Sequence, residues 1–140
     1  MVDRIHELLN RWLQEAPERP FIHLPDRVLS YADLGRLVDA LEAELRSHQV
    51  RPGDRVLVVA ENCPEHAALL LAASRVGAWA CGVNARMARG EVRAFADKAD
   101  ARIIYFTDRV SKAAAANGER FGVTPSCVPG LAHSAVFGDA

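Results

Sequence analysis

One apolar run dominates the middle of the chain: Arg55-Val56-Leu57-Val58-Val59-Ala60. Valine is β-branched and favours strands, and a strand without polar alternation is typical of a parallel sheet that is covered on both faces. The turn Arg51-Pro52-Gly53-Asp54 precedes this run, and Pro64 follows it where the first turn of a helix would begin. The run therefore predicts the central strand of a parallel sheet.

Downstream of this strand, helical and strand patterns alternate. Strands are expected at 55–60, 78–83 and 101–106, and helices at 65–76, 89–99 and 109–116. Gly77 and Asn117-Gly118 are the expected helix stops. The alternation predicts βαβ crossovers and hence a three-layer α/β fold over 51–116, with a parallel sheet between flanking helices.

Upstream of the strand, residues 1–50 predict a lead-in of helix, small hairpin and helix. The expected segments are a helix over 3–14, strands over 21–24 and 27–29, and a helix from Ser30 to about His48. Ser30 can accept from the backbone N–H of Asp33, whose charge suits the positive end of a helix. Residues 117–140 are rich in Gly, Pro and Ser, and we expect mostly loop there with a short strand over 135–137. The whole chain, 1–140, has the length of one domain or of part of one.

The composition is that of a globular protein and disfavours several classes. In 140 residues, 17 basic side chains balance 18 acidic ones, for a net charge of −1. Without a net positive charge the chain has no general attraction for nucleic-acid phosphates, so no nucleic-acid partner is expected. No apolar run approaches the ~18–20 residues of a membrane span, and the N-terminus does not resemble a secretory signal. The cytoplasm is the expected compartment.

The cysteines and histidines do not predict a disulfide framework or a metal site. There are three cysteines, an odd number, and no C-x-x-C spacing. Cys63, Cys81 and Cys127 are therefore expected to be buried thiols in a reducing compartment. Cys63 also lies where a helix N-terminus could lower its pKa, which leaves a nucleophilic role as a minor alternative. The five histidines are scattered, and none stands four residues from another histidine or a cysteine.

Motifs that cradle phosphates or activate nucleophiles are absent. The glycines form neither G-x-G-x-x-G nor G-x-x-x-x-G-K-[ST], and no G-x-S-x-G occurs. A basic excess gathers at Arg86, Arg89, Arg93, Lys98 and Arg102. These side chains are either a solvated helix face or a place where a phosphate rests.

Five short segments carry a more specific signal than any single motif. They are Leu29-Ser30-Tyr31-Ala32-Asp33-Leu34, Val50-Arg51-Pro52-Gly53-Asp54-Arg55-Val56, Glu61-Asn62-Cys63-Pro64-Glu65, Arg75-Val76-Gly77-Ala78 and Val83-Asn84-Ala85-Arg86-Met87. Their order and spacing resemble the start of the adenylate-forming acyl-CoA synthetase family, the AMP-dependent synthetases and ligases. The resemblance covers about residues 4–137. Ala85 departs from the family pattern, which has proline there in an N-P-R turn.

The resemblance implies that the chain is the N-terminal part of an enzyme of several hundred residues. Members of this family bind ATP with Mg and a carboxylic acid, form an acyl-adenylate and pass the acyl group to coenzyme A. Their phosphate loop, S/T-S-G-T-T-G-x-P-K, and their catalytic lysine come later in the sequence, and Lys98 and Lys112 match neither context. No catalytic residue and no ATP or metal site is therefore assigned in this chain.

One residue carries over from the family. Arg86 matches the arginine of the N-P-R turn, which in the family lies toward the surface where coenzyme A can enter. A guanidinium suits a phosphate through bidentate hydrogen bonds. The resemblance therefore implies that Arg86 is a candidate coenzyme A phosphate contact, with a plain surface arginine as the alternative.

We expect the N-terminal portion of an ATP-dependent carboxylic acid–CoA ligase that cannot catalyse adenylation alone, because the groups that stabilise the phosphates are missing. The alternative is a non-catalytic interaction module derived from that fold, and a self-contained small α/β enzyme is a third hypothesis. The expected partner is the rest of the ligase or a complementary chain. Strands that are apolar on both faces should leave an uncovered edge, so the isolated chain is expected to oligomerise or dissolve poorly. The acid substrate is not identified.

Overall fold

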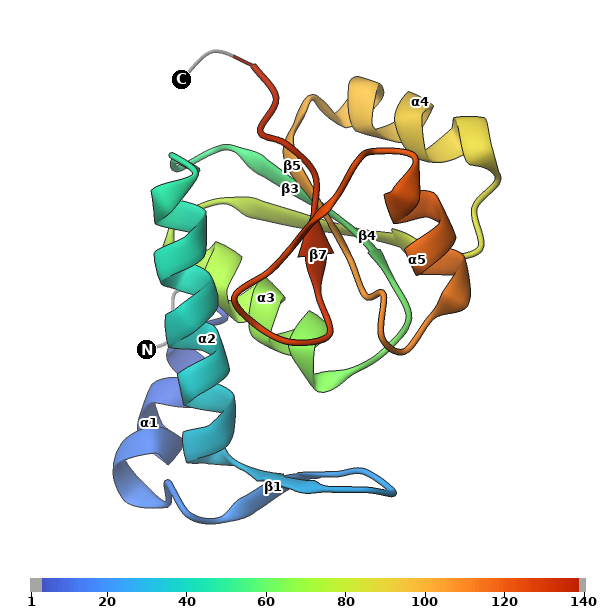
Figure 1. Ribbon diagram of the computed structural model, residues 1–140. Coiled ribbons are helices and arrows are strands. Elements are labelled where there is room, and N and C mark those ends of the chain that lie inside the picture. Colours follow the sequence, from blue (N-terminus) through green and yellow to red (C-terminus); the bar gives the residue numbers. More distant parts are fainter. Residues whose placement is uncertain (1–3, 139–140) are drawn as a thin grey trace.

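A mixed sheet forms the centre of the computed structural model, which describes residues 4–138 (Figure 1). Its strands, in spatial order, are β4 (Trp79–Asn84), β3 (Arg55–Ala60), β5 (Ala101–Phe106), β7 (Ala132–His133) and β6 (Thr124–Pro125). β3 pairs in parallel with β4 and with β5, which confirms it as the central parallel strand. β7 pairs antiparallel with β5 and with β6, so the sheet is parallel only over its first three strands.

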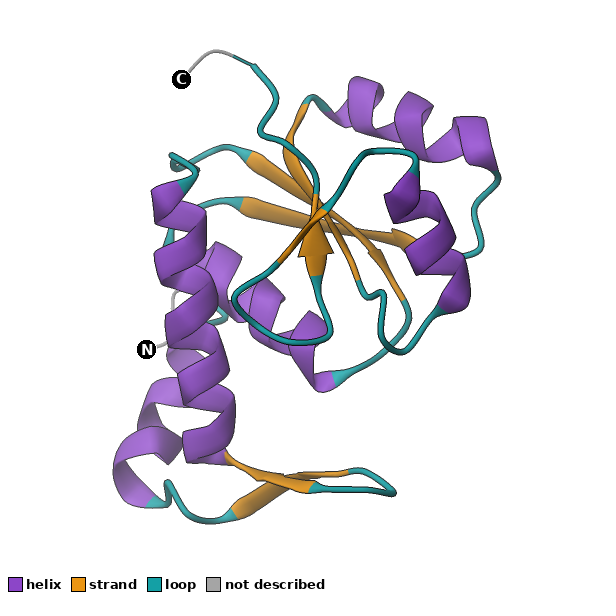
Figure 2. Cartoon of the chain, in the orientation of Figure 1, coloured by secondary structure: helices purple, strands orange, loops and turns teal. Residues whose placement is uncertain are grey.

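Helices cover both faces of the sheet, as the three-layer α/β prediction required (Figures 1 and 2). The helices are α1 (Glu7–Glu15), α2 (Tyr31–Ser47), α3 (Pro64–Arg75), α4 (Arg89–Ala99) and α5 (Lys112–Glu119). Successive side chains of a strand point to opposite faces. Val56 and Val58 accordingly pack in the cluster that includes α2 and α3, whereas Leu57 and Val59 pack in the cluster that includes α4 and α5. The unbroken apolar run of β3 is thus explained by a core on each side.

The apolar sequence of 78–83 predicts a second buried strand, but the structure places it at the edge of the sheet as β4. β4 has β3 on one side and no strand on the other among the described residues. Trp79 is 67% exposed, and Gly82 and Asn84 are exposed as well. The prediction was wrong because small apolar residues such as those of β4 occur in both central and edge strands, and only the pairing partners distinguish them.

The last helix also differs from its prediction. α5 begins at Lys112, after Ser111, whose Oγ accepts from the backbone N–H of Ala114 at 3.0 Å. It continues through Asn117 and Gly118, both buried, where a stop was expected. Gly118 lies within the helix, beside the Phe106 ring, and does not end it.

The C-terminal segment forms strands at 124–125 and 132–133 and not at 135–137. The expected strand was displaced because only Val136 and Phe137 marked it, whereas pairing with β5 selects Ala132 and His133. Residues 134–137 still follow β5, since Ser134 donates its N–H to the carbonyl of Ile104 at 2.8 Å.

The lead-in has the predicted order of helix, hairpin and helix. β1 (Pro20–His23) and β2 (Val28–Ser30) pair antiparallel, and α2 follows directly. The Ser30 hydroxyl accepts from the N–H of Asp33 at 3.1 Å, and the Asp33 carboxylate accepts from the N–H of Ser30 at 2.9 Å. These two bonds form a capping box and confirm the predicted helix start. α1 begins at Glu7, later than expected, and position 3 lies outside the described residues.

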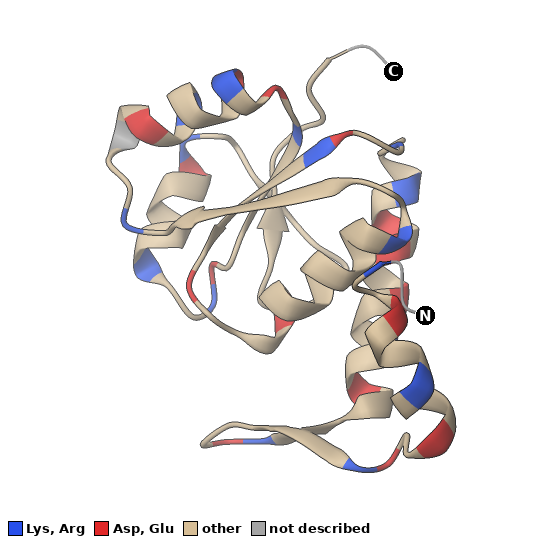
Figure 3. Cartoon of the chain, turned by 180° about the vertical axis from the view of Figure 1, so that it is seen from behind, with Lys and Arg blue, Asp and Glu red and all other residues tan. Residues whose placement is uncertain are grey.

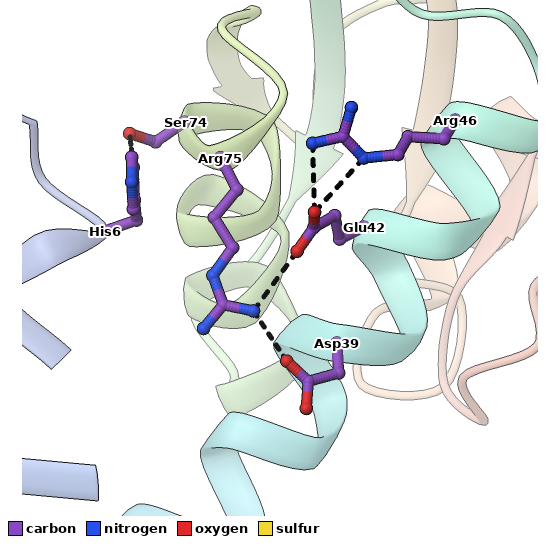
Figure 4. Close-up of polar contacts among 6 residues, drawn as sticks. All are labelled: His6, Asp39, Glu42, Arg46, Ser74 and Arg75. Atoms are coloured by element: carbon purple, nitrogen blue, oxygen red, sulfur yellow. Dashed lines mark hydrogen bonds and ion pairs between the residues drawn. The ribbon is translucent and has the colours of Figure 1, made fainter. Parts of the chain in front are cut away.

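Polar contacts connect α3 with α2 and with the residue before α1 (Figure 4). Arg75 of α3 donates to Asp39 and Glu42 of α2, at 2.6 and 3.2 Å. His6, which precedes α1, lies 2.8 Å from the hydroxyl of Ser74 on α3. Together with the apolar packing between them, these contacts fix the relative positions of α1, α2 and α3. None of the helices within 4–138 combines the length and apolar character that a membrane span requires.

Candidate functional site

The carboxyl ends of three parallel strands meet at one edge of the sheet. We call the segments that follow them, 60–65, 84–88 and 107–111, the carboxyl edge. An open cavity of about 380 Å³ lies there, lined by Ala60, Glu61, Asn62, Val83, Asn84 and Arg86. In open α/β sheets, ligands bind in the crevice outside the carboxyl ends of the strands. The carboxyl edge is therefore the candidate ligand site.

The structure places Arg86, the residue singled out from the sequence, in this cavity. Its side chain is 80% exposed, and its Nε lies 3.5 Å from Oε1 of Glu61. Its backbone N–H donates to Oδ1 of Asn84 at 2.8 Å, which fixes the turn after β4. An exposed ion pair of this kind is weak. The guanidinium can therefore leave Glu61 for a stronger anionic ligand.

Two buried residues that sequence reasoning missed as site residues hold the backbone of the carboxyl edge. Nδ2 of Asn117, on α5, donates to the carbonyls of Ala85 and Met87 at 3.0 and 3.3 Å. The hydroxyl of Thr107 accepts from the N–H of Glu61 at 3.0 Å and joins the exits of β3 and β5. An Asn-Gly pair is typical of a turn, so the neighbouring sequence did not indicate that Asn117 is buried and bonds to the backbone of another segment.

A third missed residue, Glu65, holds two arginines from distant segments. Its side chain is 2% exposed, and Oε1 accepts from Nη2 of Arg27 at 2.7 Å and from Nη2 of Arg109. Burial acts to raise the pKa of the Glu65 carboxyl, but the hydrogen bond from Arg27, a backbone N–H and the charges of both arginines outweigh it and lower the pKa. Glu65 thereby joins the hairpin, the start of α3 and the exit of β5. The position of an acidic residue in the first turn of a helix was the available signal.

Cys63, at the start of α3, does not have the properties of a nucleophile. Burial raises the pKa of its thiol, and the charge of Glu65 raises it further, so the thiol stays protonated at neutral pH. All three cysteines are free; Cys63 and Cys81 are partly buried. Cys127 is exposed, which corrects the expectation of a buried thiol because its loop lies on the outside of α2. Within 4–138 no group of three or more His, Cys, Asp or Glu side chains is arranged to hold a metal ion.

The basic residues that cluster in the sequence do not form one patch. Arg86 follows the end of β4, whereas Arg102 lies in β5 near its start, at the opposite end of the sheet. Arg102 is bonded to the carbonyl of Phe137 at 2.8 Å, and Arg93 lies over the ring of Phe121. Figure 3 shows basic and acidic segments interspersed over the helices and turns. Arg86 lines the cavity at the carboxyl edge.

The fold and its carboxyl edge define an α/β domain of the kind that binds small ligands at the ends of parallel strands. Comparison with known sequences makes this specific: the profile of the AMP-binding enzyme family matches residues 9–133, so the chain belongs to that family. Curated relatives include 3-hydroxybenzoate–CoA ligase of Aromatoleum sp. (strain CIB), 30% identical over 92 residues, which are 66% of this chain and 18% of the ligase. Another is indoleacetate–CoA ligase of Aromatoleum aromaticum, 35% identical over 89 residues, which are 64% of this chain and 18% of the ligase.

A solved structure supports the fold. The N-terminal domain of FACL13 from Mycobacterium tuberculosis superposes with a TM-score of 0.70 at 24% identity, over 74% of this chain and 26% of that one. The chain thus spans about a fifth of the length of the curated ligases it matches. The likeness confirms the fold over the superposed part of the chain.

Proposed function

We propose that the chain forms the opening layers of an ATP-dependent carboxylic acid–CoA ligase and cannot form an acyl-adenylate without further polypeptide. The family match over 9–133 carries this proposal. The carboxyl edge supports it, because it offers an exposed arginine and a shallow cavity but no glycine-rich loop to surround a triphosphate. ATP, Mg and coenzyme A would bind in the complete enzyme, mainly through later residues.

The acid is proposed to be aromatic. Both curated ligases reported above are named for aromatic carboxylic acids, 3-hydroxybenzoate and indoleacetate. The corresponding test measures pyrophosphate release with Mg-ATP, coenzyme A and each acid. It compares the chain alone with the chain mixed with a 3-hydroxybenzoate–CoA ligase from which the aligned segment has been removed.

We expect no turnover from the chain alone or from the shortened ligase alone, and acid-dependent pyrophosphate release from the mixture. Turnover by the isolated chain would contradict the proposal and favour a self-contained enzyme. Tight binding of Mg-ATP by the isolated chain, measured by calorimetry, would also contradict it.

Arg86 is proposed to contact a phosphate of coenzyme A in the complete enzyme. Because a charge-assisted hydrogen bond contributes about 1.5–3 kcal/mol, Arg86→Ala should raise KM for coenzyme A roughly tenfold or more and leave the adenylation half-reaction unchanged. Arg11→Ala is the matched control, since Arg11 is an exposed arginine on α1 that pairs with Glu15. Equal KM values for the two variants would show that Arg86 is a plain surface arginine.

An interaction module derived from this fold is the second candidate. An open, almost wholly apolar cavity of about 370 Å³ favours it; the cavity lies between α1, the hairpin, α2 and α3 and includes Trp12, Phe21 and Tyr31. Exposed apolar surface of this kind marks binding sites in many proteins. Failure of the mixture to restore ligase activity, although both parts are folded, would favour this candidate.

A further inference from the structure

The last segment of the chain crosses the sheet as a strap. We define the strap as residues 124–137, which contain β6, β7 and the loop between them (Figures 1 and 2). Its backbone follows β5: Phe137 donates to the carbonyl of Arg102 at 2.8 Å, and the hydroxyl of Ser134 accepts from the N–H of Ile104 at 3.0 Å. Val128 and Leu131 enter the core beside α2. The strap is therefore a discrete element with a limited set of attachments.

One attachment is the carboxylate of Glu44 on α2. It accepts from the hydroxyls of Tyr105 and Ser126, each at 2.7 Å, and from the backbone N–H of Cys127 at 2.8 Å. Burial acts to raise the pKa of Glu44, but these donors outweigh it and lower the pKa. Glu44 therefore stays ionised at every pH at which a histidine titrates, so this attachment does not respond to pH near 6.

Another attachment, beside the end of α2, is a pair of histidines. His48 ends α2, and His133 lies in β7; their ring centroids are 4.7 Å apart, in an edge-to-face arrangement. His133 is 7% exposed, and its Nδ1 is 2.8 Å from the carbonyl of Ser134, so this nitrogen must carry a proton to donate. His48 borders an open cavity of about 340 Å³, which gives protons in solution access to the pair.

The charges around the two rings are mostly fixed between pH 5 and 7. The facing groups are Glu44 on α2, Arg102 and Tyr105 on β5, Cys127 in the strap, and Asp54, which lies 4.0 Å from Arg102. Burial raises the pKa of the Tyr105 hydroxyl and of the Cys127 thiol, so both stay neutral, while Glu44 stays anionic and Arg102 cationic. The imidazole of His48 is thus the group of this cluster whose change of charge matters here.

Protonation of His48 opposes the closed strap. Burial lowers the pKa of His48, and the neighbouring His133 lowers it further, against the smaller opposite effect of Glu44. Two adjacent imidazolium rings would repel each other, and Arg102, which borders the same cavity as His48, adds a third positive charge. The neutral rings, in contrast, pack edge to face without repulsion.

We propose that the His48–His133 contact is a pH-sensitive latch that holds the strap against α2 and β5 and releases it as the solution becomes acidic. Since the closed state disfavours the proton on His48, the open state binds it more readily as the pH falls below about 6.5. For uptake of one proton, the closed-to-open ratio falls by at most about tenfold per pH unit in this window. The two core clusters that flank β3 contain no histidine. Burial also lowers the pKa of His66 on α3, beside Gly82 of β4, so β3, and not β4, serves as the internal reference for release of the strap.

Hydrogen exchange followed by NMR tests the latch on the whole chain. We expect the protection factors of Ser134 and Phe137 to fall up to about tenfold per pH unit between pH 6.5 and 5.0, while those of β3 stay constant. Imidazole spectra, recorded on the same samples, should show His48 titrating over the same range. His48→Gln keeps a polar side chain without the charge and should abolish the fall in protection. His23→Gln, on the exposed hairpin, is the matched control and should behave like the wild type.

The wild-type titration is decisive even if a variant does not fold. Constant strap protection from pH 7.5 to 5.0 would overturn the latch, and so would a fall whose midpoint does not follow His48. A fall of equal size in β3 would show general acid destabilisation instead. A His48→Gln protein that folds and still loses strap protection like the wild type would also overturn the proposal.

Discussion

Thr107, Asn117 and Glu65 are buried polar residues that connect segments far apart in the chain. Each supplies hydrogen bonds that the backbone or a guanidinium at the carboxyl edge would otherwise lack. A buried polar group that loses its partner costs about 1–3 kcal/mol. The shape of the candidate site therefore depends more on these interior residues than on the exposed Arg86.

Glu65→Gln tests how much the Glu65 carboxylate contributes to stability. The amide keeps the shape and one acceptor but leaves Arg27 and Arg109 without a counter-charge. Both guanidinium groups are partly exposed, at 35% and 48%, and can rehydrate, so we expect a loss of about 1–3 kcal/mol in the free energy of unfolding. Urea denaturation at pH 7 measures it. Glu15→Gln, which removes an exposed carboxylate beside Arg11, is the control and should change stability by less than about 0.5 kcal/mol.

The same carboxylate gives a pH dependence with a defined sign. Because the pKa of Glu65 is lower in the folded protein than in the unfolded chain, its contribution is complete above the ordinary carboxyl pKa and is lost as the pH falls through the folded value. The difference in stability between wild type and Glu65→Gln should therefore be constant from pH 6 to 8 and shrink toward pH 3. A difference that grows on acidification would show that burial, rather than the arginines, dominates at this site.

Among the helices and strands, the features that were predicted correctly depend on residues that are close together in the sequence. The capping box of α2 needs only Ser30 and Asp33, and the central position of β3 follows from an apolar run that only a strand with two covered faces requires. The antiparallel β7 was not found, because Ala132 and His133 form a strand only where β5 offers a partner. For Asn117 the reason is the same, since its hydrogen bonds to the carbonyls of Ala85 and Met87 override the turn preference of an Asn-Gly pair. At the site, Arg86 was located through the family resemblance, whereas the residues that position its turn were visible only in three dimensions.

Asn117→Ala tests how far α5 controls the turn after β4. The substitution favours the helix itself by about 0.5 kcal/mol but leaves the carbonyls of Ala85 and Met87 without their donor. We expect a net loss of about 1–2 kcal/mol in stability and faster amide exchange at Arg86 than in wild type. Asn62→Ala, at an exposed position of the same edge, is the matched control. Unchanged exchange at Arg86 would mean that Asn84 alone holds the turn.

At the scale of the whole molecule, two of the uncovered apolar surfaces lie where a further chain could bind. One is the cavity beside α1 and the hairpin, where Ile5, Leu8 and Phe21 are about half exposed or more. The other is the outer edge of β4, which presents Trp79 and contains neither lysine nor proline, the residues that commonly protect an edge strand. Both surfaces are consistent with a domain that normally meets further polypeptide.

The association state of the isolated chain tests whether further polypeptide normally covers the edge of β4. Unpaired N–H and C=O groups along β4 can pair with another chain, and Trp79 adds apolar area to that contact. We expect concentration-dependent oligomers in sedimentation velocity and binding of a hydrophobic dye. Trp79→Lys should shift the distribution toward monomer, whereas Val110→Lys, at another exposed apolar residue, should not. A monodisperse wild-type monomer that binds no dye would show that the edge is protected without a partner, and would weaken the argument that these layers belong to a larger ligase.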